Sequence, residues 1–483
     1  MAYNSVLTDR RKFQHERTAA AMESLYADRL DDHFSELARH YRNGVSTDKA
    51  LRFAQLAAEQ ALRRGAYAEA AGLIETALKL LDKLPEGDQR FRAELALRTI
   101  ESTLAYVLHG AGSQERERAV RRMCELGEKL GERGQLLRGL IALAVHHWVR
   151  GELLLGQELA KRNLDLAETT QDPRLLVEAH HYAGMLAFSC GKLQQALSYL
   201  DDALRHASAA GLDDKVSPFV GTLYTSRSTS NRGQLLQLLG WPDKALKSAE
   251  QGLRFARDSR HLFSLALALT APGGTFRSYR REPEIALVQA KEGIALSQED
   301  GFSDWLNWGR FFHGWASAEL GQPEQGIAEM EAADAGFRQN GGQPFQQYRI
   351  ALIAQAYART GRTDEALTML NEALAQIERT GERVDHAEML RLKGEVLLMH
   401  DRSAAVEAEN CFRAGLAVAR AQEAKWWELR IATSLARLLR DTSRRDEART
   451  ILAEIYNWFS EGFDLPDLKE AKSLLEELSR EHI

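Results

Sequence analysis

Residues 361–374 read GRTDEALTMLNEAL, and residues 191–204 read GKLQQALSYLDDAL. Both stretches begin with glycine, and both place one Ala-Leu pair in the middle and another at the end. Segments such as DKALRFAQLAAEQALRRG (48–65) and YRIALIAQAYARTG (348–361) place apolar or small residues at i, i+3, i+4 and i+7 and end in glycine. This pattern indicates amphipathic helices separated by turns. Because helix-forming residues dominate and no convincing alternating strand pattern is present, the sequence predicts an all-α fold.

The same glycine-initiated unit recurs along the chain. Further copies begin at Gly65, Gly151, Gly240 and Gly321, looser copies begin at Arg281, Asp401 and Ser443, and another unit is expected near Gly112. From Gly151 onward the starting points are 40 to 49 residues apart. Such a period predicts a solenoid of about nine or ten helix pairs, in which each pair buries its apolar face against its neighbours.

Small residues around the turns resemble those of the tetratricopeptide repeat. That family places small residues at one position before the inter-helix turn and two positions after it, because the two helices approach closely there. Here these positions hold Ala354, Ala366 and Ala373; Gly184, Ala196 and Ala203; and Gly314, Gly326 and Ala333. The resemblance implies a right-handed α-solenoid. The period near 40 residues, against about 34 in the family, predicts longer helices.

The two ends of the sequence carry a second resemblance. Residues 10–44 and 424–478 look like the borders of the repeat region that ends large bacterial signalling proteins, which combine a class III adenylate cyclase-like domain with a STAND or AAA-type ATPase. The chain is also similar to the sensor arm of maltose-regulon-type activators. The resemblance implies a regulatory arm with a junction at 1–44, a repeat solenoid at 45–463 and a capping helix at 464–483. An upstream ATPase or cyclase domain is then a possible partner.

Catalytic motifs are missing from the sequence. No GxxxxGK[ST] motif is present, so the chain lacks the loop that cradles nucleotide phosphates. A class III cyclase presents two metal-binding aspartates on a sheet, and no sheet is predicted here. We therefore expect a non-catalytic protein-interaction or ligand-sensing module without a cofactor. The alternative is that the chain belongs to an enzyme whose ATPase or cyclase domains lie outside it.

Charge and residue usage argue against several other classes of function. The formal net charge of -6 gives no overall attraction to nucleic acid or anionic lipid. Three scattered cysteines, without Cys/His spacing, argue against disulfides and zinc, and adjacent histidines on a helix point too far apart to chelate a metal. Neither a signal peptide nor a long apolar run occurs, so we expect a cytoplasmic protein.

The repeat geometry predicts a binding surface. In the tetratricopeptide family, three positions on the first helix of each pair face a concave groove that usually holds partners. Here these positions include Glu178, His181, Arg227, Gln234, Trp308, Phe311, Trp315, Tyr348, Gln355, Glu388, Arg391 and Arg430, and also Met185 and Arg437. Exposed aromatic side chains in a groove are typical anchors for recognition, so Trp308, Phe311 and Trp315 predict a site for a protein partner or small-molecule effector. The alternative is that these three rings pack in the core.

One segment is irregular. Residues 272–274 read Pro-Gly-Gly inside an apparent helix, and proline removes a backbone hydrogen bond there. We expect a break or kink that either shapes a pocket beside the polar segment VSPFVGTLYTSRSTSNRG (216–233) or is a tolerated fault between long helices.

Overall fold

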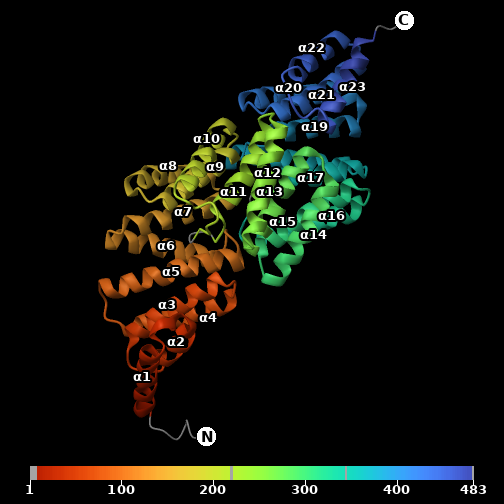
Figure 1. Ribbon diagram of the computed structural model, residues 1–483. Helices are drawn as coiled ribbons and strands as arrows, with labels where there is room; N and C mark the ends of the chain where they lie inside the picture. Colours follow the sequence, from red (N-terminus) through yellow and green to blue (C-terminus); the bar gives the residue numbers. More distant parts are fainter. Residues whose placement is uncertain (1–7, 218–220, 343–344, 481–483) are drawn as a thin grey trace. The chain divides into compact units, whose positions relative to one another are not determined.

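The predicted all-α fold is confirmed by the computed structural model, which describes residues 8–217, 221–342 and 345–480. Parts of the predicted junction (1–7), of the predicted cap (481–483) and of the VSPFVG segment (218–220) lie outside these ranges. Within them, the chain forms the α-helices α1 to α23 and short 3-10 helices, and its one β contact is an isolated bridge between Val216 and Leu223 (Figure 1). Backbone contacts divide the chain into two units, Met1–Leu143 and Ala144–Ile483.

The first unit is a stack of helices around its own core. Its helices are α1 (Thr8–Leu25), α2 (Phe34–Arg42), α3 (Thr47–Arg63), α4 (Tyr67–Leu80), α5 (Asp88–His109), α6 (Gln114–Leu130) and the first part of α7 (Arg133–Val149). Leu37, Phe53, Ile74 and Leu97 are buried together, which joins α2 through α5 in one hydrophobic cluster. The rings of Tyr41 and Phe53 stack with their centroids 5.5 Å apart.

The second unit continues as consecutive helix pairs. Its helices are α8 (Leu153–Thr170), α9 (Pro173–Ser189), α10 (Leu193–Ala209), α11 (Tyr224–Leu238), α12 (Pro242–Asp258), α13 (Leu262–Arg280), α14 (Pro283–Asp300), α15 (Ser303–Glu319), α16 (Pro323–Gln339), α17 (Gln346–Arg359), α18 (Thr363–Thr380), α19 (His386–His400), α20 (Ala405–Ala421), α21 (Lys425–Asp441), α22 (Arg445–Tyr456) and α23 (Pro466–Ser479). None of the described helices has the length and low charge that a membrane span requires.

The turns between paired helices lie where the repeat predicts them. Gly191 and Gly361 have φ angles of 74° and 85°, a left-handed conformation that glycine adopts without strain. Arg281 and Ser443 adopt the same conformation, with φ angles of 58° and 61°, at the turns that match the repeat loosely. In the described part of the chain, ten helix pairs run from α3–α4 to α21–α22, in agreement with the predicted nine or ten.

The small residues beside the turns allow paired helices to pack closely. A Cβ atom added at Gly314 of α15 would lie 2.7 Å from the carbonyl oxygen of Gly326 in α16. That distance is shorter than real Cβ contacts, so a larger side chain at this position would push the two helices apart. The interpretation of these positions as sites of close helix approach is confirmed at this pair.

Helices far apart in the sequence also meet within the second unit. The backbone nitrogen of Arg383 donates to the Ser189 carbonyl at 2.7 Å, and the rings of Trp241 and Trp458 lie 5.4 Å apart. The Tyr279 ring meets the edge of Trp427 at a centroid distance of 5.1 Å. These contacts join helices that an open groove, as the tetratricopeptide resemblance predicts it, would keep apart.

Residues 272–274 do not interrupt their helix, so the predicted break is wrong. Helix α13 runs continuously from Leu262 to Arg280 with Pro272 inside it. The side-chain amide of Gln234 in α11 donates to the Pro272 carbonyl at 3.1 Å. A Cβ atom at Gly274 would collide with the Phe312 ring of α15. Because α11 and α15 contact the segment from two sides, the helix tolerates the loss of the backbone hydrogen bond that proline cannot make.

Candidate functional site

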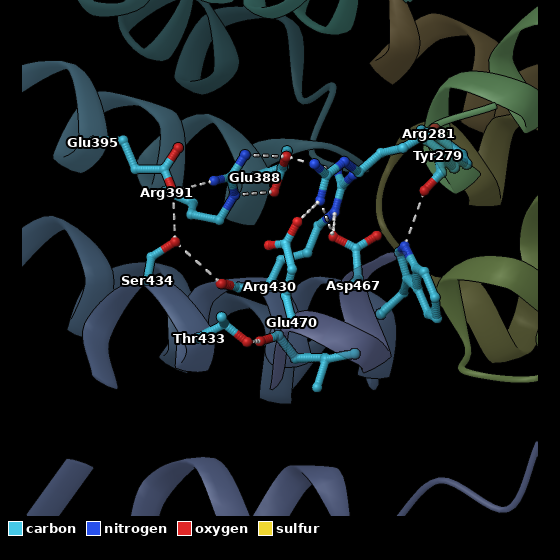
Figure 2. Close-up of polar contacts among 12 residues, drawn as sticks. Tyr279, Arg281, Glu388, Arg391, Glu395, Arg430, Thr433, Ser434, Asp467 and Glu470 are labelled. Carbon is cyan, nitrogen blue, oxygen red and sulfur yellow. Dashed lines mark hydrogen bonds and ion pairs between the residues drawn. The ribbon is translucent and has the colours of Figure 1, made fainter. Parts of the chain in front are cut away.

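A polar cavity of about 160 Å³ lies among the first helices of five successive pairs, from α13 to α21, and helix α23 (Figure 2). Five arginines and five carboxylates line it: Arg281, Arg359, Arg391, Arg430, Arg437, Glu319, Glu388, Glu395, Asp467 and Glu470. Trp315, Tyr348 and Gln355 also contribute to the wall. The formal charges therefore balance, and a ligand in the cavity would meet groups of both signs.

Glu388 is central to the ion-pair network of the cavity. Its two carboxylate oxygens each accept a hydrogen bond of 2.7 Å from Arg391, one turn further along α19. Arg430 of α21 donates to the same carboxylate at 2.9 Å. Arg391 also pairs with Glu395 at 2.6 Å, and the Ser434 hydroxyl donates to Glu395 at 2.7 Å. The network thus fixes the guanidinium planes of α19 and α21 (Figure 2).

Helix α23 closes one side of the cavity with acidic side chains. Asp467 Oδ1 accepts hydrogen bonds from Arg430 at 3.1 Å and from Arg281 at 3.4 Å. Glu470 accepts from Arg281 at 2.7 Å and from Arg437 at 2.9 Å. Arg281 lies in the α13–α14 turn and thus contacts a helix whose Asp467 is 186 residues later in the sequence. At the opposite side, Arg359 of α17 pairs with Glu319 of α15.

These ion pairs keep the network charged despite its burial. Burial opposes ionisation of Arg391, but the Glu388 and Glu395 carboxylates raise its pKa above the ordinary value. Burial likewise opposes ionisation of Glu395 and Glu470, but adjacent arginines lower the pKa of both carboxyls below the ordinary value. Arg391, Glu395 and Glu470 therefore contribute full charges to the cavity rather than neutral polar groups.

A second pair of carboxyl groups lies behind the cavity wall. Glu382 and Asp385 belong to the connection between α18 and α19, and burial raises the pKa of each to about 8. The Tyr279 hydroxyl donates to Asp385 at 3.2 Å, and the Gln347 side-chain amide faces Glu382 at 2.5 and 3.1 Å. Both carboxyls are therefore mostly protonated at neutral pH. Sequence patterns did not indicate them, because they lie in a connection rather than at a repeat position.

The structure brings half of the predicted site residues to the cavity. Trp315, Tyr348, Gln355, Glu388, Arg391 and Arg430 line it, together with Arg437 from the same repeat positions. Gln234 instead donates a hydrogen bond to the Pro272 carbonyl, as described above. The pocket expected around residues 272–274 is not part of this cavity, which begins further along α13 at Ser278.

Trp308 and Phe311 do not face an open groove, so their prediction as exposed anchors is wrong. Their exposed fractions are 4% and 0%. Trp308 stacks on Phe312 with an interplanar angle of 11°, and its ring lies 5.0 Å from that of Phe337. Trp315 is also 4% exposed, although it borders the cavity. The alternative of core packing therefore holds for Trp308 and Phe311, because these rings pack against Phe312 of the same helix and, for Trp308, against Phe337 of the paired helix α16.

Glu178, His181 and Arg227 form a separate buried cluster between α9 and α11. The Arg227 guanidinium lies 2.7 Å from the Glu178 carboxylate and donates to the Tyr182 hydroxyl at 3.2 Å. His181 shares a hydrogen bond of 2.9 Å with Ser228. Burial, together with the Arg227 charge, holds the pKa of His181 well below the ordinary value, so the imidazole is neutral. This cluster is an interhelix contact and does not line the cavity.

Several cavity residues escaped prediction. Arg281 lies in a turn, at the position where most repeats have glycine. Asp467 and Glu470 belong to a helix outside the repeat. The repeat positions used for the prediction all lie on the first helix of a pair, so they cannot indicate a residue in a turn or in a helix outside the repeat. Among the residues that the structure describes, no group of three or more His, Cys, Asp or Glu side chains has a geometry that could hold a metal ion.

Comparisons with known proteins show that this chain is similar to solved structures in fold. No protein-family model matches the chain, and no curated protein sequence matches it. A Rap protein complexed with Competence and Sporulation Factor is similar in structure, with a TM-score of 0.57 and 14% identity over 78% of this chain and 99% of that chain.

Two further solved structures are similar over shorter or less closely superposed regions. Aspartyl phosphate phosphatase F from Bacillus subtilis has a TM-score of 0.38 and 13% identity over 86% of this chain and 94% of that chain. The apo form of RapI has a TM-score of 0.39 and 14% identity over 62% of this chain and 99% of that chain. The likeness therefore rests on the first structure, and it identifies a helical repeat fold of the Rap and tetratricopeptide type.

Proposed function

We propose that the chain is a non-catalytic recognition module that binds a partner protein or a small effector at the polar cavity. The observation that carries this proposal is the gathering of five arginines and five carboxylates around one cavity inside a helical repeat. Each charge loses hydration when it is buried, and a buried ion pair is often no more stabilising than a packed apolar pair. Four of the ten groups, Glu388, Arg391, Arg430 and Asp467, have side chains that are at most 11% exposed, and this buried set is poorly explained by stability alone.

The arrangement suits recognition better than catalysis. Every arginine of the cavity is ion-paired with a neighbouring carboxylate, at distances such as 2.7 Å for Arg391–Glu388 and 2.9 Å for Arg430–Glu388 and Arg437–Glu470. A ligand that brings its own charges can exchange partners with these pairs, which gives specificity through charge complementarity. The likeness to a Rap protein solved in complex with a named factor supports binding as the use of this fold.

The sequence resemblance suggests the wider setting. We propose that the module is the regulatory arm of a bacterial signalling ATPase or adenylate cyclase system and works in the cytoplasm. A cyclase or ATPase domain encoded next to this chain would be its target. Measuring the activity of such a domain with and without the chain tests this setting, and an unchanged activity would contradict it.

Binding at the cavity can be tested with mild substitutions. We would screen amino acids, peptides, nucleotides and carboxylates for a rise in melting temperature of the full chain, and then measure affinities for Gln355→Ala and Arg359→Gln. Loss of a hydrogen bond to a charged group costs about 1.5–3 kcal/mol, so Arg359→Gln should weaken binding by about tenfold or more. Arg254→Gln is the matched control, because Arg254 is 62% exposed and belongs to α12, outside the cavity.

Two outcomes would contradict the proposal. One is a ligand that binds all three variants as tightly as the unmodified chain, since its site then lies elsewhere. The other is turnover: the purified chain is expected to release no phosphate from ATP and to form no cyclic nucleotide. Activity that stays with the intact chain through successive columns would make it an enzyme.

A further inference from the structure

We infer that helix α23 covers one side of the cavity as an internal ligand of its arginines, and that the partner is an acidic amphipathic helix that displaces it. This inference rests on the proposed function of the cavity and names its partner. Asp467 and Glu470, three residues apart on one face of α23, both pair with Arg281, and Asp467 also pairs with Arg430 (Figure 2). Glu470 pairs with Arg437 as well.

The apolar face of α23 packs at the same time. Leu468, Ala471, Leu474 and Leu478 are buried. At the end of the helix, Glu477 pairs with Arg440 of α21 at 3.0 Å. Helix α23 thus combines an apolar stripe with three acidic side chains that pair with arginines of the α13–α14 turn and of α21. This is the pattern by which an amphipathic helix is recognised in a groove.

The Asp467 side chain of α23 lies where an acidic side chain of a simple cap would not. The cap of a repeat solenoid covers the last apolar face and presents a polar outer face to water. Here Asp467 is only 7% exposed, and its Oδ2 atom has no hydrogen-bond partner among the described residues. A buried carboxylate oxygen without a donor is costly, and a cap gains nothing from it. The carboxylate is better understood as one that competes for the cavity arginines.

The connection to α23 makes its displacement feasible. Residues 457–465 link α22 to α23, whereas residues 442–444 suffice between α21 and α22. The linker has its own acidic contact, since the Glu461 carboxylate accepts from the backbone nitrogens of Asp243 and Lys244 at 3.0 and 3.3 Å. Departure of α23 would leave Arg281 and Arg437 without the Glu470 carboxylate. The uncovered strip on the α13–α14 turn and α21 would then be basic and apolar, which fits an acidic amphipathic helix and disfavours a basic one.

The test uses the full chain and a fluorescent peptide with the sequence of residues 463–480, FDLPDLKEAKSLLEELSR. In the full-length double variant Asp467→Asn/Glu470→Gln, α23 loses its ion pairs with the cavity arginines, while the arginines themselves are unchanged. We expect this variant to bind the peptide at least tenfold more tightly than the unmodified chain, as measured by fluorescence anisotropy. Adding Arg281→Gln to the double variant should remove most of that gain.

Two controls accompany the measurement. Glu476→Gln changes an acidic residue of α23 that is 58% exposed, and this variant should bind the peptide as the unmodified chain does. A peptide with lysine at the positions of Asp467 and Glu470 should not bind the double variant. Equal binding of the unmodified chain and the double variant, or tight binding of the lysine peptide, would overturn the inference.

Hydrogen exchange gives a second readout that does not depend on a variant. Saturating peptide should speed exchange of amides in residues 466–479 of the unmodified full chain at least tenfold, because displaced α23 loses its packing. If exchange and anisotropy stay unchanged while small ligands still require Gln355 or Arg359, α23 is only a cap and the cavity site stands. If the peptide displaces α23 but no ligand requires those two residues, the inference holds and the wider proposal for the cavity fails.

Discussion

The indole nitrogen of Trp426 donates a hydrogen bond of 3.0 Å to the backbone carbonyl of Tyr279, 147 residues earlier in the chain. Trp426 is fully buried, and the bond joins α21 to the last turn of α13. It is one of the contacts by which late helix pairs cover the inner face formed by early ones. The cavity exists because this closure is incomplete where charged side chains, rather than apolar ones, meet.

Removing this hydrogen bond should loosen the closure without emptying the core. Trp426→Phe keeps most of the apolar volume but leaves the buried Tyr279 carbonyl without its indole donor. An unsatisfied buried acceptor costs about 1–3 kcal/mol, so we expect a loss of this order in the free energy of unfolding. Urea unfolding followed by circular dichroism measures it. The same change at Trp458, which is 39% exposed, serves as the control, and equal losses at both positions would contradict a special role for Trp426.

Trp308 should behave as a core residue rather than as a binding anchor. It is 4% exposed and packs against Phe312 and Phe337, so Trp308→Ala leaves a large void between α15 and α16. Truncation of a buried tryptophan typically costs about 3–5 kcal/mol. Thermal and urea unfolding of the variant are the measurements. A variant that melts with the unmodified chain would show instead that Trp308 is dispensable for packing.

Local sequence patterns predicted the helices and turns of this protein well. The reason is that most of these turns contain a residue with positive φ, and paired helices need small residues where they touch. The α19–α20 turn is an exception, because Asp401 has a φ angle of -147°. Gly191 and Gly361 meet the first requirement, and Gly314 with Gly326 meets the second. Both requirements are local, so they recur with the period of the repeat and can be recognised in a single sequence.

The candidate site was predicted only in part, because its formation depends on long-range closure. The repeat positions include Glu388 and Arg391 of α19 and Arg430 of α21, which line the cavity. They could not indicate Asp467, which reaches Arg281 from a helix 186 residues away. The curvature of a solenoid is the sum of small rotations between pairs, and no local pattern determines whether its inner face stays open. Trp308 and Phe311 were expected to be exposed and are buried, because Trp308 packs against Phe312 of its own helix and Phe337 of the paired helix, and Phe311 against Phe312.

The buried carboxyls Glu382 and Asp385 should make the stability depend on pH. Their pKa is about 8 in the folded chain, against about 4 in an unfolded one. The folded state therefore holds protons that the unfolded state releases, so this contribution is present at acidic pH and is lost as pH rises towards 8 and above. Nearby charges modify it, since the Arg349 cation favours ionisation of Glu382 and the Glu388 anion disfavours that of Asp385.

Neutral substitution should remove part of that dependence. Asp385→Asn keeps an acceptor for the Tyr279 hydroxyl but cannot ionise, so its free energy of unfolding should fall less between pH 6 and pH 9. Over this pH interval, we expect the free energy of unfolding of the variant to fall by about 1–3 kcal/mol less than that of the unmodified chain. Asp364→Asn, at a position that is 87% exposed, is the control. Parallel stability curves for Asp385→Asn and the unmodified chain would show that Asp385 does not stay protonated in the fold.

The ion pair between Glu178 and Arg227 should matter for folding rather than for recognition. The two side chains are 0% and 3% exposed and lie 2.7 Å apart, away from the cavity. Arg227→Met leaves the Glu178 carboxylate buried without its cation, and breaking a buried pair in this way costs about 3–5 kcal/mol. The double variant Glu178→Leu/Arg227→Met removes both charges and should recover most of that loss, whereas cavity ligands should bind the double variant and the unmodified chain equally. Urea unfolding of both single variants and the double variant gives the coupling energy. A double variant as unstable as Arg227→Met would contradict this account, because the loss would then come from the Arg227 contacts with Tyr182 and Thr222 instead.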